Sequence, residues 1–266
     1  MLAACNTPSG DPDAAAVQVV GHGGSGFETV FRPLPANTRE SIAKAISDGG
    51  DGVEMDIQLS KDDQVVVFHD KELDKKTNCS GHLRDFTLRE ITACDFNGDY
   101  PRIENHTHHI DALSDILNML DTIAQGKWIY LNVKPCPSGD RKSYNEVMSS
   151  ALVQLIRQHQ ITTRAIVETS DMELLQMIAA KDGEVIIMQD TGLYADDIQQ
   201  VLENHFDGIV IDKDDITADQ VKEAQVKGLK VIIYGLKTRT AIRNVLKMHP
   251  DAVQTDRVGL TLDLRN

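Results

Sequence analysis

The regular alternation of short apolar strands with amphipathic helices is the feature that most constrains the fold of this chain. From residue 17 onward, short apolar runs take turns with segments whose apolar residues recur every three to four positions. Repeated strand–helix units produce a parallel sheet that is covered by helices. Such a sheet either closes into a barrel or stays open as a doubly wound sheet.

Nine segments are predicted to be strands. They are Val17–Gly21, Gly52–Leu59, Val65–Phe68, Trp128–Val133, Ala165–Glu168, Glu184–Met188, Gly208–Ile211, Lys230–Ile233 and Ala252–Thr255. The polar residues 61–64 between the second and third strands suggest a hairpin. If the third strand is the return arm of that hairpin, eight strands remain, which is the number that a closed barrel requires. The predicted fold class is therefore α/β, a (β/α)8 TIM barrel.

The predicted helices separate these strands and complete the repeating units. They are Thr38–Asp48, Leu113–Ala124, Tyr144–Gln158, Met172–Ala180, Ala195–Asn204, Ala218–Lys227, Thr240–Lys247 and a short stretch near Leu260. The length of 266 residues is close to the roughly 250 residues of a single barrel. We therefore predict one domain over residues 17–266. Residues 71–111 are polar and lack periodicity, so we expect them to be an insertion over the top of the barrel, after the second strand region.

Composition argues against a nucleic-acid partner, a membrane span and a structural zinc site. The 41 acidic residues outnumber the 27 basic ones, and the resulting charge of −14 would repel a nucleic acid. A small phosphorylated substrate remains compatible with this charge if a local cation offsets it. No apolar run is long enough to span a membrane. The four cysteines lack the spacing of a zinc site, and a barrel of this length needs no disulfide to support its core.

The first residues resemble the lipobox of a bacterial lipoprotein. Leu2-Ala3-Ala4-Cys5 places a cysteine after two small residues, and a turn-rich polar segment follows it. We therefore interpret residues 1–16 as a lipobox remnant with a polar tether. This interpretation predicts that the protein meets the membrane only through a lipid anchor on Cys5. It also predicts a periplasmic or surface lipoprotein of the cell envelope, with a secreted protein as the alternative.

Two carboxylates on one predicted strand indicate a cation site. Glu54 and Asp56 are two residues apart, so both side chains point to the same side of the strand. Two like charges inside a barrel repel each other unless a cation neutralises them. The oxygen ligands favour Mg²⁺ or Ca²⁺. The alternative is that one of the carboxylates faces solvent at a frayed strand end.

Two histidines are predicted to lie beside these carboxylates. His22 follows the first strand, and the hairpin would return His69 opposite Asp56. A lone histidine is more often structural, but two histidines beside a bound cation form a plausible acid–base pair for cleaving a phosphoester. Other predicted strand ends also carry polar residues, as loops commonly do: Asn132, Lys134, Glu168, Gln189, Asp190, Asp212, Tyr234 and Asp256.

Four stretches of the chain resemble the glycerophosphodiester phosphodiesterase family. The longest is Gly50–Asp70, with the sequence GDGVEMDIQLSKDDQVVVFHD, and it is the most specific. The others are Val20-Gly21-His22-Gly23-Gly24, Pro35-Ala36-Asn37-Thr38 and Gln254-Thr255-Asp256-Arg257. The resemblance is densest from Val19 to Gly81, and the order of elements fits from about Val17 to Leu260.

This resemblance implies a fold, an activity and a set of site residues. The family folds as a TIM barrel with an insertion after the second histidine, and one divalent cation, Mg²⁺ or Ca²⁺, supports hydrolysis of glycerophosphodiesters to glycerol 3-phosphate and an alcohol. Its paired histidines correspond to His22 and His69, its metal carboxylates to Glu54 and Asp56, and its lysine to Lys134. One histidine would take a proton from a glycerol hydroxyl, and the other would protonate the leaving alcohol. Lys134 would stabilise charge on the phosphoryl group.

Three positions depart from the family pattern. Gly23 replaces an arginine, Ala36 replaces a glutamate, and Asn132 replaces a third metal glutamate. The first two losses could be linked, because removing an arginine removes the need for a nearby countercharge. The backbone N–H groups of Gly23 and Gly24 could bind phosphate in place of the arginine, or this turn could be an ordinary flexible loop.

The third departure concerns the cation. Asn132 offers a carbonyl oxygen as a candidate metal ligand, and Glu168 on the next strand is a candidate replacement for the lost carboxylate. Two functions remain open at this point. The chain is either a metal-dependent phosphodiesterase acting on a small glycerophosphodiester, or a weakened or inactive barrel that binds phosphodiesters or polyol phosphates.

Overall fold

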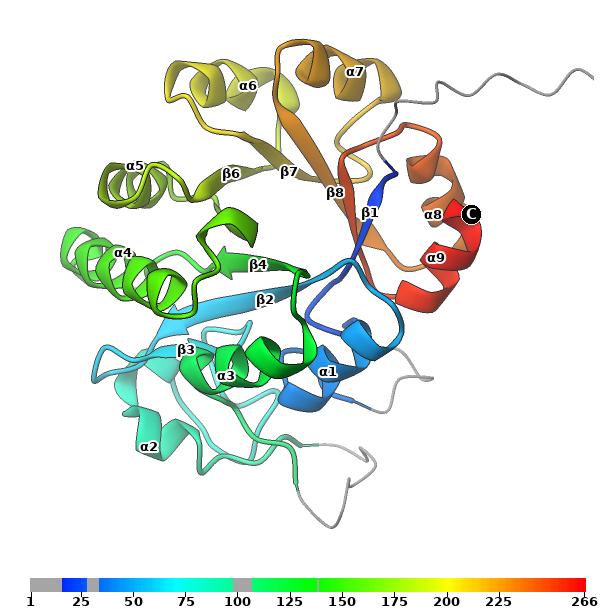
Figure 1. Ribbon diagram of the computed structural model, residues 1–266. Helices are drawn as coiled ribbons and strands as arrows, with labels where there is room; N and C mark the ends of the chain where they lie inside the picture. The colour runs from blue at the N-terminus through cyan, green and yellow to red at the C-terminus, as the bar shows by residue number, and fades with distance from the viewer. Residues whose placement is uncertain (1–15, 28–33, 98–106, 138) are drawn as a thin grey trace, which may run out of the picture.

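Eight parallel strands close into a ring because the first strand pairs with both the second and the last. In the computed structural model, which describes residues 16–27, 34–97, 107–137 and 139–266, β1 (Gln18–Gly21) lies between β2 (Gly52–Leu59) and β9 (Ala252–Thr255). Around the ring the order is β1, β9, β8, β7, β6, β5, β4 and β2, with helices outside it (Figure 1). The predicted (β/α)8 barrel is confirmed.

The third strand is the return arm of a hairpin, as the polar turn indicates. β3 (Val65–Val67) pairs antiparallel with the end of β2 and takes no place in the ring. The remaining strands of the ring are β4 (Trp128–Val133), β5 (Ala165–Thr169), β6 (Ile186–Thr191), β7 (Gly208–Asp212) and β8 (Lys230–Leu236).

The helices on the outside of the ring follow the predicted pattern. They are α1 (Arg39–Ser47), α3 (Leu113–Ile123), α4 (Arg141–Gln158), α5 (Met172–Lys181), α6 (Tyr194–Glu203), α7 (Ala218–Val226), α8 (Arg239–Leu246) and α9 (Val258–Arg265). Several boundaries differ from the prediction by one to three residues, and two of them have a local cause. β6 begins after Glu184, whose N–H donates to Asp182 in a turn, and α4 begins earlier because Asp140 caps its first turn.

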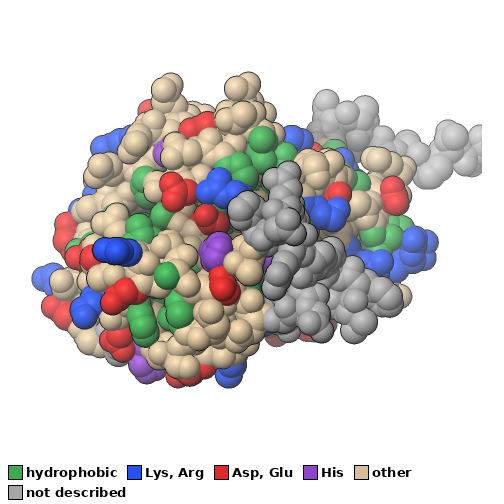
Figure 2. Space-filling view, turned by 90° about the horizontal axis from the view of Figure 1, so that it is seen from below, with side chains coloured by type: hydrophobic (Ala, Val, Ile, Leu, Met, Phe, Trp, Pro, Cys, Tyr) green, Lys and Arg blue, Asp and Glu red, His purple; other side chains and the backbone are tan. Residues whose placement is uncertain are grey.

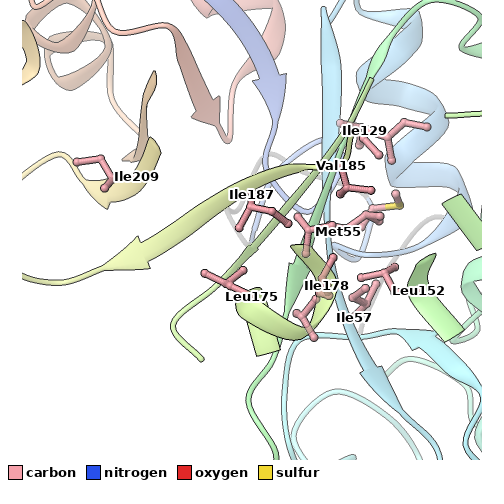
Figure 3. Packing of buried hydrophobic residues seen from close by; sticks show 14 of the residues in the cluster. Met55, Ile57, Ile129, Leu152, Leu175, Ile178, Val185, Ile187 and Ile209 are labelled. Carbon is pink, nitrogen blue, oxygen red and sulfur yellow. The ribbon is translucent and has the colours of Figure 1, made fainter. Parts of the chain in front are cut away.

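Strand alternation divides each strand into an outer and an inner face. On β2, Met55 and Ile57 are fully buried in the outer layer, where they pack with residues such as Leu152 of α4 (Figure 3). The residues that alternate with them, Glu54 and Asp56, point into the barrel. A separate inner cluster fills the barrel axis, and its members are Val20, Tyr130, Ile166, Met188, Val210, Ile232 and Ala252. The inner polar residues of β2 therefore lie above an apolar floor.

The insertion after β3 has a small core of its own. Val66, Phe68, Leu73, Leu83, Ile91, Cys94 and Ile110 form this cluster. The insertion includes a short 3₁₀ helix η1 (Leu83–Asp85) and helix α2 (Leu88–Ile91). A disulfide joins Cys79 to Cys94 within it. The sequence did not predict this bond, which lies in the insertion and not in the barrel core.

The predicted lipobox and tether lie largely outside the described residues. Cys5 and the rest of residues 1–15 belong to that part of the chain, so the boundary at residue 16 and the anchor on Cys5 stay predictions. Among the helices that the structure describes, none is both long enough and apolar enough to cross a membrane.

Candidate active site

The inner face of β2 carries the two predicted carboxylates, and both are buried. Glu54 is 0% and Asp56 is 1% exposed, so neither lies at a frayed, solvated strand end. Asp56 accepts a hydrogen bond from Asn37 Nδ2 at 2.7 Å on one oxygen and pairs with Lys134 Nζ at 2.5 Å on the other. The predicted lysine therefore lies directly on one of the predicted metal carboxylates.

The surroundings push the two carboxyl pKa values in opposite directions. Burial, together with the charge of Asp56, raises the pKa of Glu54 well above its usual value. Burial also acts to raise the pKa of Asp56, but the charges of Lys134 and His69 outweigh it and leave that pKa lowered. One oxygen of Glu54, Oε1, is buried without a hydrogen-bond partner. An unpaired buried carboxylate oxygen is costly unless a cation or a proton satisfies it.

His22 is held at the end of β1 by the last strand of the barrel. Its Nδ1 lies 2.9 Å from Asp256 Oδ1, and the two residues follow the paired ends of β1 and β9. Burial acts to lower the pKa of His22. The hydrogen bond with Asp256 and the charge of Glu54 act to raise it and together outweigh burial, so the net shift is upward. Asp256 thus orients the imidazole and leaves Nε2 as the atom available for proton transfer.

His69 contacts the same phenylalanine, Phe27, as His22 does. Its Nδ1 is 2.7 Å from Asp70 Oδ1, and its side chain is half exposed. The ring centroid of Phe27 is 4.6 Å from that of His22 and 5.2 Å from that of His69. The structure therefore brings the two predicted histidines to the same phenylalanine. The N–H of Phe68, the residue before His69, donates to the backbone oxygen of Asp56 at 2.9 Å, which places His69 beside the carboxylate strand.

The two candidate replacement ligands lie next to Asp56 in the sheet register. Asp56 pairs with Asn132, which in turn pairs with Glu168 on β5. Glu168 is buried, and Gln254 Nε2 donates to both of its oxygens at 2.9 Å. Burial raises the pKa of Glu168 to about 8 despite this hydrogen bond. Gln254 thus engages both oxygens of Glu168, whereas Asn132 lies closer to the carboxylate pair in register.

The glycine turn after β1 is used within the protein. Gly23 N–H donates to Glu54 Oε2 at 2.7 Å, and Gly24 N–H donates to the backbone oxygen of Glu54 at 3.2 Å. These two donors hold Glu54 in place, so the geometry lends no support to the predicted phosphate-binding role of Gly23 and Gly24. Ser25 N–H is also engaged, by the hydroxyl of Ser41.

The charged groups at the mouth of the barrel border a pocket of about 470 Å³. Its lining includes His69, Lys75 and Lys134. Figure 2 shows a face on which histidine, basic and acidic side chains lie interspersed. In the described ranges of the chain, no group of three or more histidine, cysteine, aspartate or glutamate side chains is gathered as a metal site. The cation would therefore rely on Glu54 and Asp56, with the Asn132 amide as a further oxygen.

Sequence reasoning missed the partners that position these groups. Asp256 appeared as a polar strand end and as part of a motif, but not as the partner of His22, although closure of the barrel places the last strand beside the first. Asn37 appeared only as part of a motif, yet its side chain both donates to the Asp56 carboxylate and accepts from the Asp56 N–H at 2.9 Å. Phe27 carried no signal in the sequence, because nothing local shows that it lies between two distant histidines.

The fold and these residue types place the chain among TIM-barrel proteins with a polar site at the carboxyl end of the strands. Residues 25–260 match the glycerophosphoryl diester phosphodiesterase family, and the chain belongs to that family. The chain is 45% identical over 62 residues to the glycerophosphodiester phosphodiesterase of Caldanaerobacter subterraneus subsp. tengcongensis, a segment that covers 23% of this chain and 26% of that protein.

Solved structures show the same fold over nearly the whole chain. A phosphodiesterase of Oleispira antarctica in complex with the product sn-glycerol-3-phosphate has a TM-score of 0.81 and 23% identity, covering 94% of this chain and 96% of that one. The glycerophosphodiester phosphodiesterase of Agrobacterium tumefaciens has a TM-score of 0.75 and 21% identity, covering 93% and 99%. By contrast, the matched segment spans about a quarter to a third of the first curated relatives.

Proposed function

We propose that this protein is a metal-dependent phosphodiesterase that hydrolyses small glycerophosphodiesters to glycerol 3-phosphate and an alcohol. The observation that carries the proposal is the meeting of His22 and His69 on Phe27, beside the buried Glu54 and Asp56. Membership of the family and the product named for the Oleispira antarctica structure support it. Among the described residues, no observation favours the alternative of a barrel that only binds its ligand.

The residues present suit a hard divalent cation such as Mg²⁺ or Ca²⁺. Glu54 has a buried oxygen without a partner and a pKa raised by burial and by Asp56, and a bound cation would relieve both conditions. When bound, such an ion polarises a phosphoryl oxygen and lowers the pKa of a coordinated hydroxyl. Glu54 and Asp56 would hold it, with the Asn132 amide as a neutral ligand.

The chain's own groups supply positioning and proton transfer. Asn37 and Lys134 fix Asp56 from two sides, and Lys134 would also face negative charge that builds up on the phosphoryl oxygens. His22 is oriented by Asp256 and its raised pKa keeps it protonated to higher pH, which suits the group that protonates the leaving alcohol. His69 would then take the proton of the attacking hydroxyl.

Release of glycerol 3-phosphate tests this function directly. We expect the purified protein to release it from glycerophosphoglycerol or glycerophosphocholine with Mg²⁺ or Ca²⁺, and to lose this activity with EDTA. Restoring the ion should restore the rate, because chelation leaves the barrel itself intact. Release that is unaffected by EDTA would refute the metal dependence, and an absence of release with either ion would refute the phosphodiesterase.

We also propose that the protein works outside the cytoplasm, anchored through a lipid on Cys5. The disulfide between Cys79 and Cys94 supports this location, because disulfides persist mainly in oxidising compartments. In native protein alkylated without reductant, we expect Cys79 and Cys94 to be protected and the peptide that begins at Cys5 to carry acyl groups. Mass spectrometry that finds both thiols alkylated, or an unmodified Cys5 in an uncleaved chain, would contradict the proposal.

A further inference from the structure

Phe27 occupies space that a side chain at position 23 would need. A Cβ atom built on Gly23 would lie 2.6 Å from Cε2 of Phe27 and 3.0 Å from Cβ of Ala36. Gly23 also has a φ of 55°, in the left-handed region that favours glycine. Positions 23 and 36 are therefore neighbours, and Phe27 packs where they meet.

The ring of Phe27 is held over the mouth of the barrel. Its N–H donates to Asp256 Oδ1 at 3.3 Å, so the same carboxylate that orients His22 also fixes the backbone of Phe27. The ring contacts both histidines. Because Phe27 and His69 line one pocket, a substrate group that enters this pocket beside His69 also meets an aromatic side chain.

A pocket of about 340 Å³ opens beside this ring, and its walls are mainly apolar. Phe27, Pro35, Ala36, Phe68 and Phe96 provide the apolar lining. Phe68 directly follows β3, and Phe96 belongs to the insertion. Their ring centroids are 6.0 Å apart. His69 and Asn37 line the same pocket. The pocket therefore connects with the proposed chemistry at His69 and, through Asn37, with Asp56.

The charged groups around this pocket do not favour a cation. Lys75 lines it, and the one carboxylate in its described lining, Asp70, is hydrogen-bonded to His69. Sites that bind quaternary ammonium groups surround the cation with ring faces and commonly add negative charge. Beyond this engaged carboxylate the described lining supplies no negative charge, so an uncharged apolar alcohol suits these walls better than a cationic one such as choline.

The neighbouring pocket suits the other part of the substrate. It shares His69, Asp70 and Lys75 with the apolar pocket but adds Lys134 and other charged side chains. Glycerol and phosphate present hydroxyl and anionic oxygens, which need polar and cationic partners. The glycerol phosphate portion therefore fits the pocket that contains Lys134, which leaves the apolar pocket for the alcohol.

We propose that Phe27 is a specificity-determining residue of this protein, and that the apolar pocket beside His69 receives the leaving alcohol. The pocket selects an alcohol with an apolar body and no positive charge over a cationic one. This proposal rests on the proposed phosphodiesterase function. Ala36 contributes to the selection because it gives the wall of the pocket a small uncharged side chain.

The test compares two diesters that share glycerol phosphate and differ in the alcohol. Glycerophosphocholine carries a cation, and the benzyl diester of glycerol 3-phosphate carries an uncharged ring. We expect the benzyl-to-choline ratio of kcat/KM to fall by about tenfold in Phe27→Ala, because an apolar wall is lost. A similar fall is expected in Ala36→Glu, which adds a negative charge to the pocket. Comparing each variant with the wild type cancels the intrinsic reactivity of the two alcohols.

Matched variants separate these causes from general damage. Phe27→Leu keeps an apolar wall and Ala36→Gln keeps the size without the charge, so both should leave the ratio nearly unchanged. If the ratio stays at its wild-type value in both Phe27→Ala and Ala36→Glu, the proposal is overturned, while the hydrolysis measured in the same assay upholds the phosphodiesterase. If neither diester is hydrolysed, the proposed function fails. The preference is then measured by calorimetric binding of the two diesters, and the proposal falls if Phe27→Ala leaves that preference unchanged.

Discussion

Replacing either histidine at the mouth of the barrel by alanine is expected to lower kcat for glycerophosphodiester hydrolysis by about 10²-fold or more, the scale of general acid–base catalysis. Both side chains contact Phe27, and neither belongs to the buried apolar core. We therefore expect His22→Ala and His69→Ala to keep the fold, which circular dichroism and thermal unfolding would verify. Steady-state release of glycerol 3-phosphate measures the effect.

A third histidine provides a matched control for these variants. His82 lies in the insertion, where its Nδ1 is 3.9 Å from Glu72 Oε1 and its side chain is 62% exposed. His82→Ala removes an imidazole of the same kind without touching the mouth of the barrel, so its rate should equal that of the wild type. Near-native rates for both His22→Ala and His69→Ala would show that proton transfer occurs elsewhere.

The pH profile separates the roles of the two histidines. Because Asp256 and Glu54 raise the pKa of His22, the protonated form persists to higher pH, and an acid of this kind limits the rate on the alkaline side. Asp256→Asn removes one of these charges, so it should lower the pKa of His22 and move the alkaline limb to lower pH. An alkaline limb that does not move in this variant would assign the acid role to another group.

Asp56→Asn is expected to weaken divalent-ion binding by about tenfold or more and to reduce hydrolysis with it, since affinity for these ions depends on the ligand charge. The same change removes the partner of Lys134, which lies 2.5 Å from Asp56. Calorimetric titration with Mg²⁺ and Ca²⁺ measures binding without reference to turnover. Unchanged ion affinity in this variant would remove Asp56 from the cation site.

The adjacent pair Asn132 and Glu168 shows whether the site is weak or completed by another acid. Gln254 donates to both oxygens of Glu168, and burial raises the pKa of Glu168 to about 8. We therefore expect Glu168→Gln to change ion affinity little. Asn132→Glu should instead tighten binding and raise activity at low ion concentration, because it adds a charge beside Asp56 in the register.

The opposite pattern in these two variants would identify Glu168 as a ligand. In that case Glu168→Gln would abolish ion binding, and Asn132→Glu would crowd an already satisfied site. If neither variant changes the affinity, the cation is not held at this end of the barrel. The two titrations therefore separate all three arrangements of the site.

The sequence by itself determined the barrel and the inner face of β2. Apolar periodicity is a local property, so the repeating strand and helix segments can be recognised without knowing their neighbours. The placement of Glu54 and Asp56 on one face is equally local, because alternate residues of any strand share a face. The motif resemblance added the correspondence of His22, His69 and Lys134 to the residues of a family.

Only the tertiary structure decided which groups hydrogen-bond to these residues or pack against them. His22 meets Asp256, 234 positions away, because ring closure pairs β1 with β9. Asn37 reaches Asp56 from a backbone with a φ of 64°, and Phe27 lies between the histidines beside a glycine with a φ of 55°. Contacts between distant segments depend on ring closure and on the paths of loops. Neither leaves a periodic pattern in the sequence, which is why the partners, the disulfide and the apolar pocket appear only in three dimensions.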